Sequence, residues 1–317
     1  MATFQIRAMN TSILTAGLSA EDAAQVFQWF RFIEAKFSRF LPASELSLVN
    51  GKAGEATKVS ELFAHLVYES LHYFEETGGI FTPFLGKTLS GSGYGQSFEK
   101  VERENARTDD PVDNPTGFVE PIRFNLDLRT VNINDECLFD FGGIAKGWSA
   151  EQMAASLMKK GRKEGLIDAG GDIMSWKSGS SGEPWLIGIA HPYSDDKTIA
   201  RLQLKEQAGV ATSSVIKRSW KLDGRKMHHI IDPRTGLPAE SDLVQATVIG
   251  RTLVPCEIYA KCLLILGSEQ GPSWLRLRQP ELAYILVDQQ GRLSASLNID
   301  QYLDEADLSK QITLDGS

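Results

Sequence analysis

The segment from Asp140 to Gly147, DFGGIAKG, places an acid, two adjacent glycines and a lysine within eight residues. An apolar run, CLFDF, leads into the glycines, and the residues after Lys146 have a helical pattern. A glycine-rich turn at a helix start can bring backbone N–H groups to a phosphate, and a lysine adds positive charge. The spacing matches neither GxxxxGK[ST] nor GxGxxG. Taken alone, the segment therefore favours an ordinary turn from strand to helix over a phosphate loop.

Two further segments carry titratable side chains beside turn residues. In DAGGD, Asp168 and Asp172 are predicted to form a turn by hydrogen bonding to their own backbone. In HHIIDPRTG, Asp232 and the following proline predict a turn, and His229 just before it could act as acid, base or hydrogen-bond donor. A purely structural histidine fits the same pattern.

The composition is typical of a folded protein and disfavours two classes of function. The chain has 317 residues, 42% hydrophobic, with a net charge of −8 and a pI near 5.3. Because an acidic chain has no general attraction for nucleic acid, we expect no nucleic-acid partner. No apolar run reaches the roughly 20 residues that a membrane span requires, and no signal peptide is evident. The three cysteines form no CxxC pair, which favours reduced thiols and a cytoplasmic location.

The N-terminal half predicts one strand followed by two helices. Residues 3–16 alternate loosely and predict a strand. Ser19 and Asp22 have capping-box spacing before a helix with an aromatic face. That face consists of Val26, Phe30, Ile33 and Phe37. A second helix is predicted to start after Ser60 and to end at two glycines, residues 78 and 79.

The rest of the chain predicts an α+β fold. Residues 88–120 have the composition of an exposed loop, and strands are predicted from residue 121, including CLFDF. Helices are expected at about 145–160 and 255–267, between the β-like runs WLIGIAHP, ARLQLK, LVQATVIG and AYILVD. Residues 305–317 are expected to form a loosely ordered tail. Helical and extended segments do not alternate as regular βαβ units, so mixed or antiparallel sheets flanked by helices are expected.

The order of the motifs along the chain indicates a family. DFGGIAKG, DAGGD, PWLIGIAHP, VATSS, HHIIDPRTG and a helix ending in LLILG follow one another, preceded by RAMNT, FSRFLPASELSLVN and TGGIFTPFLG. Together they resemble the ApbE family, the FAD:protein FMN transferases, over residues 3 to about 295. The resemblance implies an α+β fold related to the tunnelling fold. We expect residues 1–317 to form a single flavin transferase unit, or two lobes with an exposed loop at 88–120.

The resemblance also implies an activity. Family members bind FAD, cleave its diphosphate and attach FMN through a phosphoester to a Thr or Ser of a target flavoprotein, releasing AMP. The target would carry a Ser/Thr-Gly-Ala-Thr type acceptor. The alternative is an FAD-binding protein or an FAD pyrophosphatase of the same fold, without efficient transfer.

Site residues follow from the same resemblance. The residues implied to contact FAD are Met9, Phe40, Ile80, Phe81, Thr82, Asp140, Lys146 and Ile231. Lys146 would stabilise charge on the diphosphate, and His229 or Asp232 would act as the base. The carbonyl of Gly143 would be a ligand for Mg²⁺.

Three positions depart from the family pattern. Glu257 stands where the family has a magnesium-binding Asp, and Lys261 stands where it has a Thr ligand. Thr82 stands where relatives often have Asp. Glu257 and Lys261 have i, i+4 spacing, which is typical of an ion pair along a helix. Alternatively, the Lys261 ammonium occupies or adjoins the metal position.

Overall fold

The computed structural model describes residues 2–91, 122–178, 183–216, 219–222, 225–304 and 313–315. The chain divides into two compact units. The first contains Met1–Phe30, Lys146–Lys217 and Glu240–Ser317, and the second contains Arg31–Ala145 and Arg218–Ala239.

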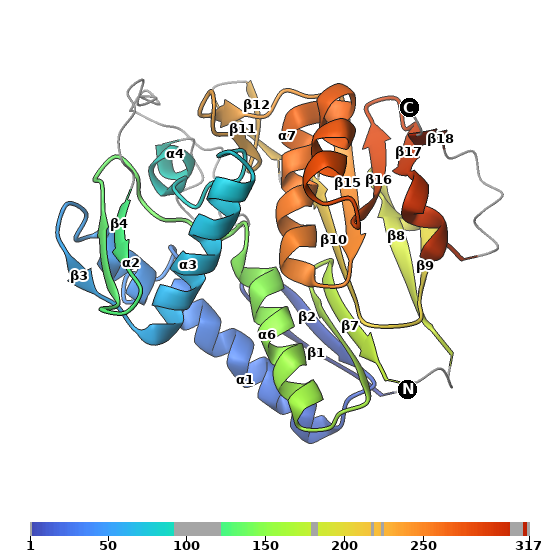
Figure 1. Cartoon of the computed structure of the whole chain (residues 1–317), viewed down its shortest axis with the longest axis horizontal. Helices are drawn as coiled ribbons and strands as arrows, with labels where there is room; N and C mark the ends of the chain where they lie inside the picture. Colours follow the sequence, from blue (N-terminus) through green and yellow to red (C-terminus); the bar gives the residue numbers. More distant parts are fainter. Residues whose placement is uncertain are drawn as a thin grey trace. The chain divides into compact units, whose positions relative to one another are not determined.

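A nine-stranded sheet of described residues forms the centre of the first unit (Figure 1). Its order is β1-β2-β6-β7-β10-β15-β16-β17-β18, and neighbours are antiparallel except for the parallel pair β17 and β18. The strands are β1 Thr3–Ala8, β2 Thr11–Ala16, β6 Glu164–Ala169, β7 Asp172–Lys177, β10 Ala208–Ser214, β15 Leu243–Gly250, β16 Ala283–Asp288, β17 Leu293–Ser296 and β18 Thr313–Asp315. The predicted α+β class with a mostly antiparallel sheet is confirmed.

Residues 3–16 form a β-hairpin, so the prediction of one strand was wrong. β1 and β2 pair in register with only Met9 and Asn10 between them. Both residues have positive φ, 52° and 55°, as a type I′ turn requires. The sequence signal was weak because the usual glycine of such a turn is absent.

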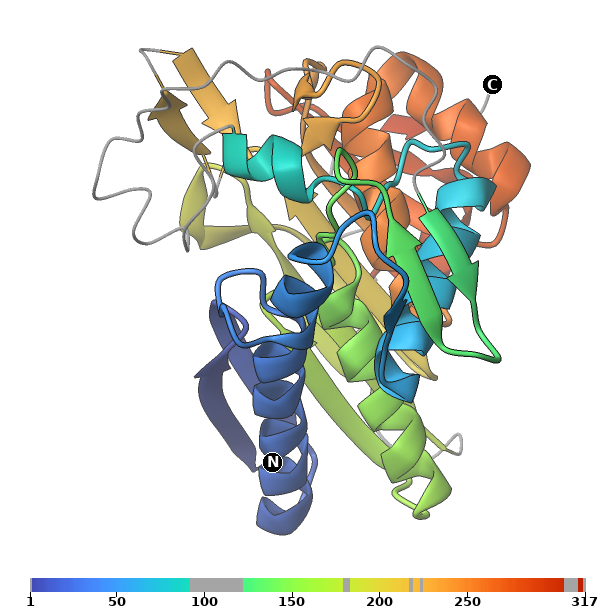
Figure 2. The same cartoon turned by 90° about the vertical axis from the view of Figure 1, so that its left-hand side faces the viewer.

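Helices α1 (Ala20–Phe37) and α6 (Ala145–Lys159) lie side by side in both views (Figures 1 and 2). The indole N–H of Trp29 donates to the carbonyl of Ser149 at 3.1 Å. The rings of Trp29 and Trp148 have centroids 6.2 Å apart.

The predicted start of α1 is confirmed, because Ser19 Oγ accepts from the Asp22 N–H at 3.1 Å. The predicted aromatic face of α1 is buried along its length.

Helix α7 (Leu253–Arg278) packs along β10 and β15 and is interrupted at Gly267. Gly267 has a φ of 75°, which no α-helical residue adopts. Gly267 divides α7 into two segments, and the helix predicted over 255–267 corresponds to the first of them. The second segment was not predicted, since Gly267 and Pro272 are residues that usually end a helix.

A side chain of α6 caps the first turn of α7. Thr252 occupies the N-cap position, but its side chain makes no cap hydrogen bond. Glu151 Oε2 instead accepts from the backbone N–H groups of Leu253 at 2.7 Å and Val254 at 3.0 Å. The carboxylate also faces the positive end of the α7 dipole, so Glu151 fixes the start of α7.

A Glu151→Ala variant is expected to lower the free energy of unfolding by about 1–2 kcal/mol, the usual loss when a helix cap is removed. Urea denaturation measures this change. Gln152→Ala, an exposed neighbour on α6, serves as the control and should leave the midpoint nearly unchanged. Equal midpoints for the two variants would contradict the capping role.

A second pair of strands adds to the core of the first unit. β8 (Trp185–His191) and β9 (Ser194–Leu204) pair antiparallel, and their apolar side chains pack with those of β10, β15 and β16. The 3₁₀ helix η1 (Leu297–Gln301) adds Ile299 to the same cluster. Four runs predicted as strands are therefore confirmed as β8, β9, β15 and β16.

The second unit consists of short elements around an aromatic core. The elements are α2 Glu45–Asn50, β3 Thr57–Lys58, α3 Glu61–Glu76, α4 Gly86–Gly91, β4 Ile122–Asn125, β5 Thr130–Ile133, β11 Ser219–Leu222, β12 Arg225–His228, β13 Ile231–Asp232 and β14 Leu237–Pro238. Ser60 caps α3 by accepting from the Phe63 N–H at 3.2 Å, which confirms the predicted start. Phe63, Phe139 and Phe141 pack with ring centroids 5.2–6.0 Å apart.

The run CLFDF is not a strand, so that prediction was wrong. The amide side chain of Asn50 takes the place of a neighbouring strand. It accepts from the Phe139 N–H at 2.9 Å and donates to the Phe139 carbonyl at 2.9 Å. The next N–H, of Asp140, donates to the carbonyl of Pro83 at 2.8 Å. The apolar pattern reflects burial of the phenylalanines rather than sheet pairing.

Two predicted irregular segments coincide only partly with the described residues. Of the loop predicted over 88–120, residues 88–91 belong to α4, where Leu89 is buried, and 92–120 lie outside the described residues. Of the predicted tail, only Thr313–Asp315 lies within the described residues, where it forms β18 and pairs with β17. The Tyr284 hydroxyl donates to the Asp315 carboxylate at 3.2 Å and helps to hold this strand.

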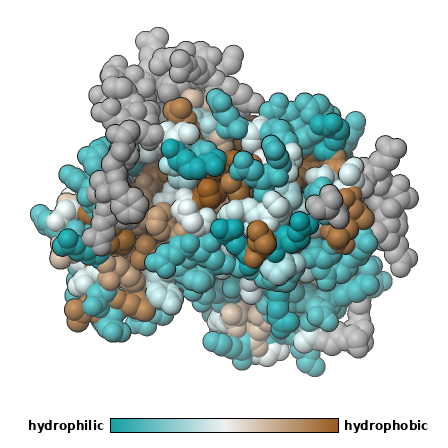
Figure 3. Space-filling view, turned by 45° about the horizontal axis from the view of Figure 1, so that its top comes forward, coloured by the Kyte–Doolittle hydropathy of each residue, from teal (hydrophilic) through white to brown (hydrophobic). Residues whose placement is uncertain are grey.

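Apolar side chains reach the surface at separate places on the described residues. Leu128, in the turn between β4 and β5, and Leu277, in α7, are among the most exposed. Figure 3 shows a face on which hydrophilic side chains surround smaller apolar groups. No helix within the described ranges is long and apolar enough to cross a membrane. Scattered apolar side chains of this kind are ordinary on a protein surface.

Candidate functional site

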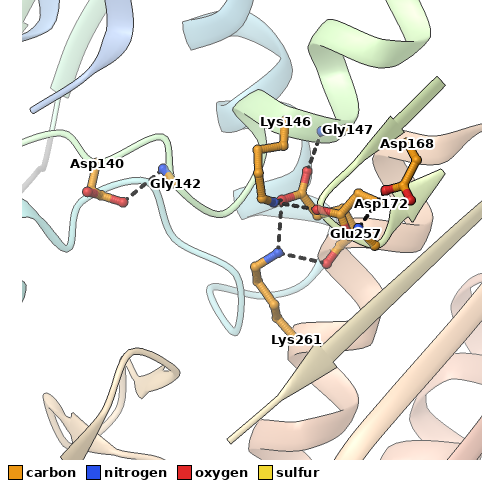
Figure 4. Close-up of polar contacts among 9 residues, drawn as sticks. Asp140, Gly142, Lys146, Gly147, Asp168, Asp172, Glu257 and Lys261 are labelled. Atoms are coloured by element: carbon orange, nitrogen blue, oxygen red, sulfur yellow. Dashed lines mark hydrogen bonds and ion pairs between the residues drawn. The ribbon is translucent and has the colours of Figure 1, made fainter. Parts of the chain in front are cut away.

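Four charged side chains meet at the start of α6 in the first unit (Figure 4). Lys146, in the first turn of α6, donates to Asp172 Oδ2 at the start of β7 and to Glu257 Oε1 on α7, the latter at 2.6 Å. Lys261, one turn further along α7, donates to the same Glu257 Oε1 at 3.2 Å and to the Glu257 carbonyl at 3.1 Å. The structure therefore joins Lys146, Glu257 and Lys261, all candidates from the sequence, in one cluster.

The contacts of Gly147 explain why the segment DFGGIAKG ends in a glycine. Its N–H donates to Glu257 Oε2 at 2.8 Å. A Cβ built on Gly147 would lie 2.7 Å from that oxygen, closer than atoms can approach without movement. Glycine therefore lets the Glu257 carboxylate pack against this helix turn without being displaced.

The two lysine side chains of the cluster are more exposed than its two carboxylate side chains. The Glu257 and Asp172 side chains are 0% and 7% exposed, whereas those of Lys146 and Lys261 are 12% and 17% exposed. The arrangement can therefore present positive charge to an anion while the counter-ions remain buried.

Burial and pairing shift the pKa values in this cluster. Burial favours the neutral form of Glu257, but Lys146 and Lys261 outweigh it and lower the pKa of Glu257 to about 2. Burial likewise opposes the charge on Lys146, but Asp172 and Glu257 raise its pKa above the ordinary value. For Asp172, burial dominates and raises the pKa despite Lys146. Burial also lowers the pKa of Lys261, offset in part by Glu257.

Asp172 is the site residue that sequence reasoning missed. Asp168 forms the predicted turn contact, since its Oδ1 accepts from the Gly171 N–H at 2.7 Å. Asp172 does not; it begins β7 and binds Lys146 instead. An acid that directly precedes the apolar run IMSW was the available signal, because the start of a buried strand is costly for an unpaired carboxylate.

The second unit holds Asp140 in a defined position. Asp140 Oδ2 pairs with Arg39 Nε at 2.8 Å, and Oδ1 accepts from the Gly142 N–H at 2.9 Å. The guanidinium of Arg39 lies 4.5 Å from the centroid of the Phe40 ring. The turn containing Gly143 follows directly and leads into α6.

Two of the residues predicted to contact FAD share one apolar cluster in the second unit. Phe40 packs against the cluster that contains Ile231, Trp220 and Leu89. Phe81 is also buried, and its N–H donates to Thr77 Oγ1 at 3.0 Å, while Ile80 and Thr82 beside it are half-buried. The structure therefore brings Phe40 and Ile231 together and places the segment from Ile80 to Thr82 at the end of α3.

The two candidate bases differ in their surroundings. Asp232 is buried, and Arg234 binds both its oxygens, at 2.9 and 3.2 Å from Nε and 2.7 Å from Nη2. Burial would raise the pKa of Asp232, but these bonds lower it below its usual value. His229 is half-buried and follows His228, whose Nε2 lies 3.2 Å from the carbonyl of Ala239. A carboxylate that is already paired with a guanidinium is a weaker base than an unpaired carboxylate, which counts against Asp232.

Met9, the remaining FAD candidate, belongs to the first unit. It occupies the tight turn between β1 and β2 with a φ of 52°. The hairpin turn accounts for this backbone conformation, so the φ value of Met9 does not by itself indicate a functional role.

Comparison with known proteins identifies related chains. The model of the ApbE family matches residues 2–286. The FAD:protein FMN transferase of Escherichia coli (strain K12) is 26% identical over 235 residues, which are 74% of this chain and 66% of that protein. The chain thus spans just under two thirds of that relative. The FAD:protein FMN transferase of Treponema pallidum is 25% identical over 298 residues, covering 86% of this chain and 79% of its own length.

Solved structures show the same fold. The ApbE protein of Thermotoga maritima superposes with a TM-score of 0.82 at 23% identity, covering 96% of this chain and 99% of its own. The flavin transferase ApbE of Vibrio cholerae superposes with a TM-score of 0.77 at 22% identity, covering 95% and 99%.

Proposed function

Because the chain belongs to the ApbE family, we propose that it is an FAD:protein FMN transferase, with FAD and a target flavoprotein as its substrates. The family match over residues 2–286 carries this proposal. The names of the relatives support it, as does the cluster of Lys146, Asp172, Glu257 and Lys261, in which the lysine side chains are more exposed than the carboxylates.

The proposed reaction exchanges one bond to phosphorus for another. The hydroxyl oxygen of a target Thr or Ser attacks the phosphorus on the FMN side of the diphosphate. The bond from that phosphorus to the bridging oxygen breaks, and AMP leaves with the bridging oxygen. The hydroxyl proton passes to a base. Such a reaction needs positioning and charge stabilisation more than covalent catalysis, and Lys146 is suited to stabilise the charge.

A magnesium ion, which the resemblance implies, does not fit the side chains present. Lys261 occupies the position of an oxygen ligand, and a protonated ammonium has no lone pair to offer. Glu257 Oε1 already accepts from two ammonium groups, and Oε2 accepts from the Gly147 N–H. Among the described residues, no three His, Cys, Asp or Glu side chains are grouped to hold a metal ion. We therefore assign no step of the reaction to magnesium.

A transfer assay tests the proposed function. The purified chain is mixed with FAD and a flavoprotein domain carrying a Ser/Thr-Gly-Ala-Thr acceptor, with and without Mg²⁺. Covalent flavin on the denatured target together with free AMP is the expected result. AMP without labelled target would favour a pyrophosphatase, and FAD binding without either product would favour a flavin-binding protein.

We also propose that the target lies in the cytoplasm. Cell fractionation, which shows where the chain and its flavin-labelled target are found, would test this location.

A His229→Ala variant is expected to lower the transfer rate by about 10²–10⁴-fold, the usual contribution of a general base. FAD affinity should stay the same, because the base acts on the target hydroxyl. Asp232→Asn is the matched comparison and should change the rate much less, since Arg234 already pairs with that carboxylate. A larger loss in Asp232→Asn than in His229→Ala would reverse the assignment.

A further inference from the structure

We infer that the ammonium groups of Lys146 and Lys261 together bind the FAD diphosphate in place of a magnesium ion. FAD binding by this chain would then need no divalent metal. The inference rests on the proposed function and adds to it the groups that neutralise the diphosphate.

Each of the two ammonium groups retains one donor. A lysine ammonium has three N–H donors. Lys146 uses two of them, on Asp172 and Glu257, and Lys261 uses two on the carbonyl and Oε1 of Glu257. Within the described part of the chain, one N–H on each lysine is therefore left for an acceptor from outside.

The two remaining donors are close enough to act on one ligand. Both lysines bind the same oxygen, Glu257 Oε1, which holds their ammonium groups next to each other. These two lysines are the more exposed members of the cluster, while both carboxylates are buried. A diphosphate carries several negative oxygens and can accept from both lysines, in hydrogen bonds that opposite charges strengthen.

The position of the pair also suits an anion. Lys146 lies in the first turn of α6, which is 15 residues long and directs its N–H groups and positive dipole end toward this region. The buried carboxylates fix the two ammonium groups before any ligand binds. A metal ion at Glu257 would instead have to lie against both of them and would be repelled.

Binding measurements on the unaltered chain give the first test. FAD is titrated into the full-length protein with excess EDTA and, separately, with excess Mg²⁺, and the affinity is measured by calorimetry. Binding of Mn²⁺, as a spectroscopic substitute for Mg²⁺, is followed by electron paramagnetic resonance. We expect equal FAD affinity in both buffers and no retention of Mn²⁺ by the protein, with or without FAD.

Variants at position 261 give the second test. Lys261→Met should weaken FAD binding in EDTA by about 10–100-fold, the value of a charged hydrogen bond. Binding of riboflavin, which lacks the diphosphate, should be unchanged. Lys261→Arg retains the charge and should weaken FAD binding less. Lys159→Met, which removes an exposed charge from the end of α6, is the control.

The double variant Glu257→Asp/Lys261→Thr restores the family pattern. This variant should bind Mn²⁺ and should require Mg²⁺ for tight FAD binding.

The outcomes separate the inference from the proposed function. FAD affinity that falls in EDTA, or Mn²⁺ retained by the unaltered chain, would overturn the inference without contradicting the proposed transferase activity. FAD affinity of Lys261→Met equal to that of the unaltered chain would also overturn it. A chain that neither binds FAD nor transfers FMN in either buffer would overturn both. Metal-independent FAD binding without transfer would support the inference and favour the flavin-binding alternative.

Discussion

A Lys146→Met variant is expected to lose FMN transfer by about 10²–10³-fold at saturating FAD, which is the usual effect of removing one preorganised donor from a charged transition state. Lys146 is fixed by Asp172 and Glu257 at the start of α6, so its ammonium needs no rearrangement during the reaction. The loss should appear in single-turnover measurements of covalent flavin on the target. Methionine retains most of the side-chain length, so the lost charge is the main change.

The Lys146→Met result needs a control for charge and another for folding. Lys159→Met removes an exposed lysine from the other end of the same helix and should transfer FMN at the wild-type rate. Because Lys146→Met leaves two buried carboxylates with one ammonium, thermal unfolding is measured and the assay is run well below the transition. A folded variant that transfers at the wild-type rate would exclude Lys146 from the reaction.

The elements that the sequence predicted well are those specified by local signals. The serines before α1 and α3 accept from the backbone N–H groups that their spacing predicted. Gly78 and Gly79 both have positive φ just after α3. Such signals act within a few residues, and so the sequence alone displays them.

The predictions that failed depended on contacts between distant residues. Whether CLFDF forms a strand was decided by Asn50, which is 89 residues from Phe139 and occupies its backbone hydrogen bonds. The role of Asp172 likewise depended on Lys146, which is 26 residues away, and Glu257 is 111 residues from Lys146. No local pattern encodes these pairings. The resemblance to a family indicated Lys146 and Glu257 as site residues. The spacing of neighbouring residues in the sequence did not indicate either of them.

The i, i+4 ion pair predicted between Glu257 and Lys261 is present, but it belongs to a larger network. An exposed pair of this kind contributes a few tenths of a kcal/mol to a helix. Glu257, however, is fully buried and accepts from two ammonium groups and one backbone N–H. Burial turns a minor surface contact into one that the folded state requires, because a buried charge without its partners is costly.

A Glu257→Gln variant is accordingly expected to lower the free energy of unfolding at neutral pH by about 3–5 kcal/mol, the usual cost of breaking a buried ion pair. The amide oxygen can still accept from Gly147, but an amide cannot neutralise Lys146 and Lys261, which would be left close together. Urea denaturation measures the difference from the wild type. Glu269→Gln, an exposed position on the same helix, is the control and should change stability by less than about 0.5 kcal/mol.

The difference between the wild type and Glu257→Gln should depend on pH with a definite sign. The folded-state pKa of Glu257 is about 2, below its ordinary value of 4.5. A lowered pKa means that the ionised carboxylate stabilises the folded state above pH 4.5, and that this contribution disappears as the pH falls from 4.5 to about 2. The two proteins should therefore become more alike in stability across this window. A difference that stays constant or grows on acidification would show that Glu257 does not act as a paired anion. Its ionisation is what holds the two lysines together, so that result would also remove the basis for their joint binding of a diphosphate.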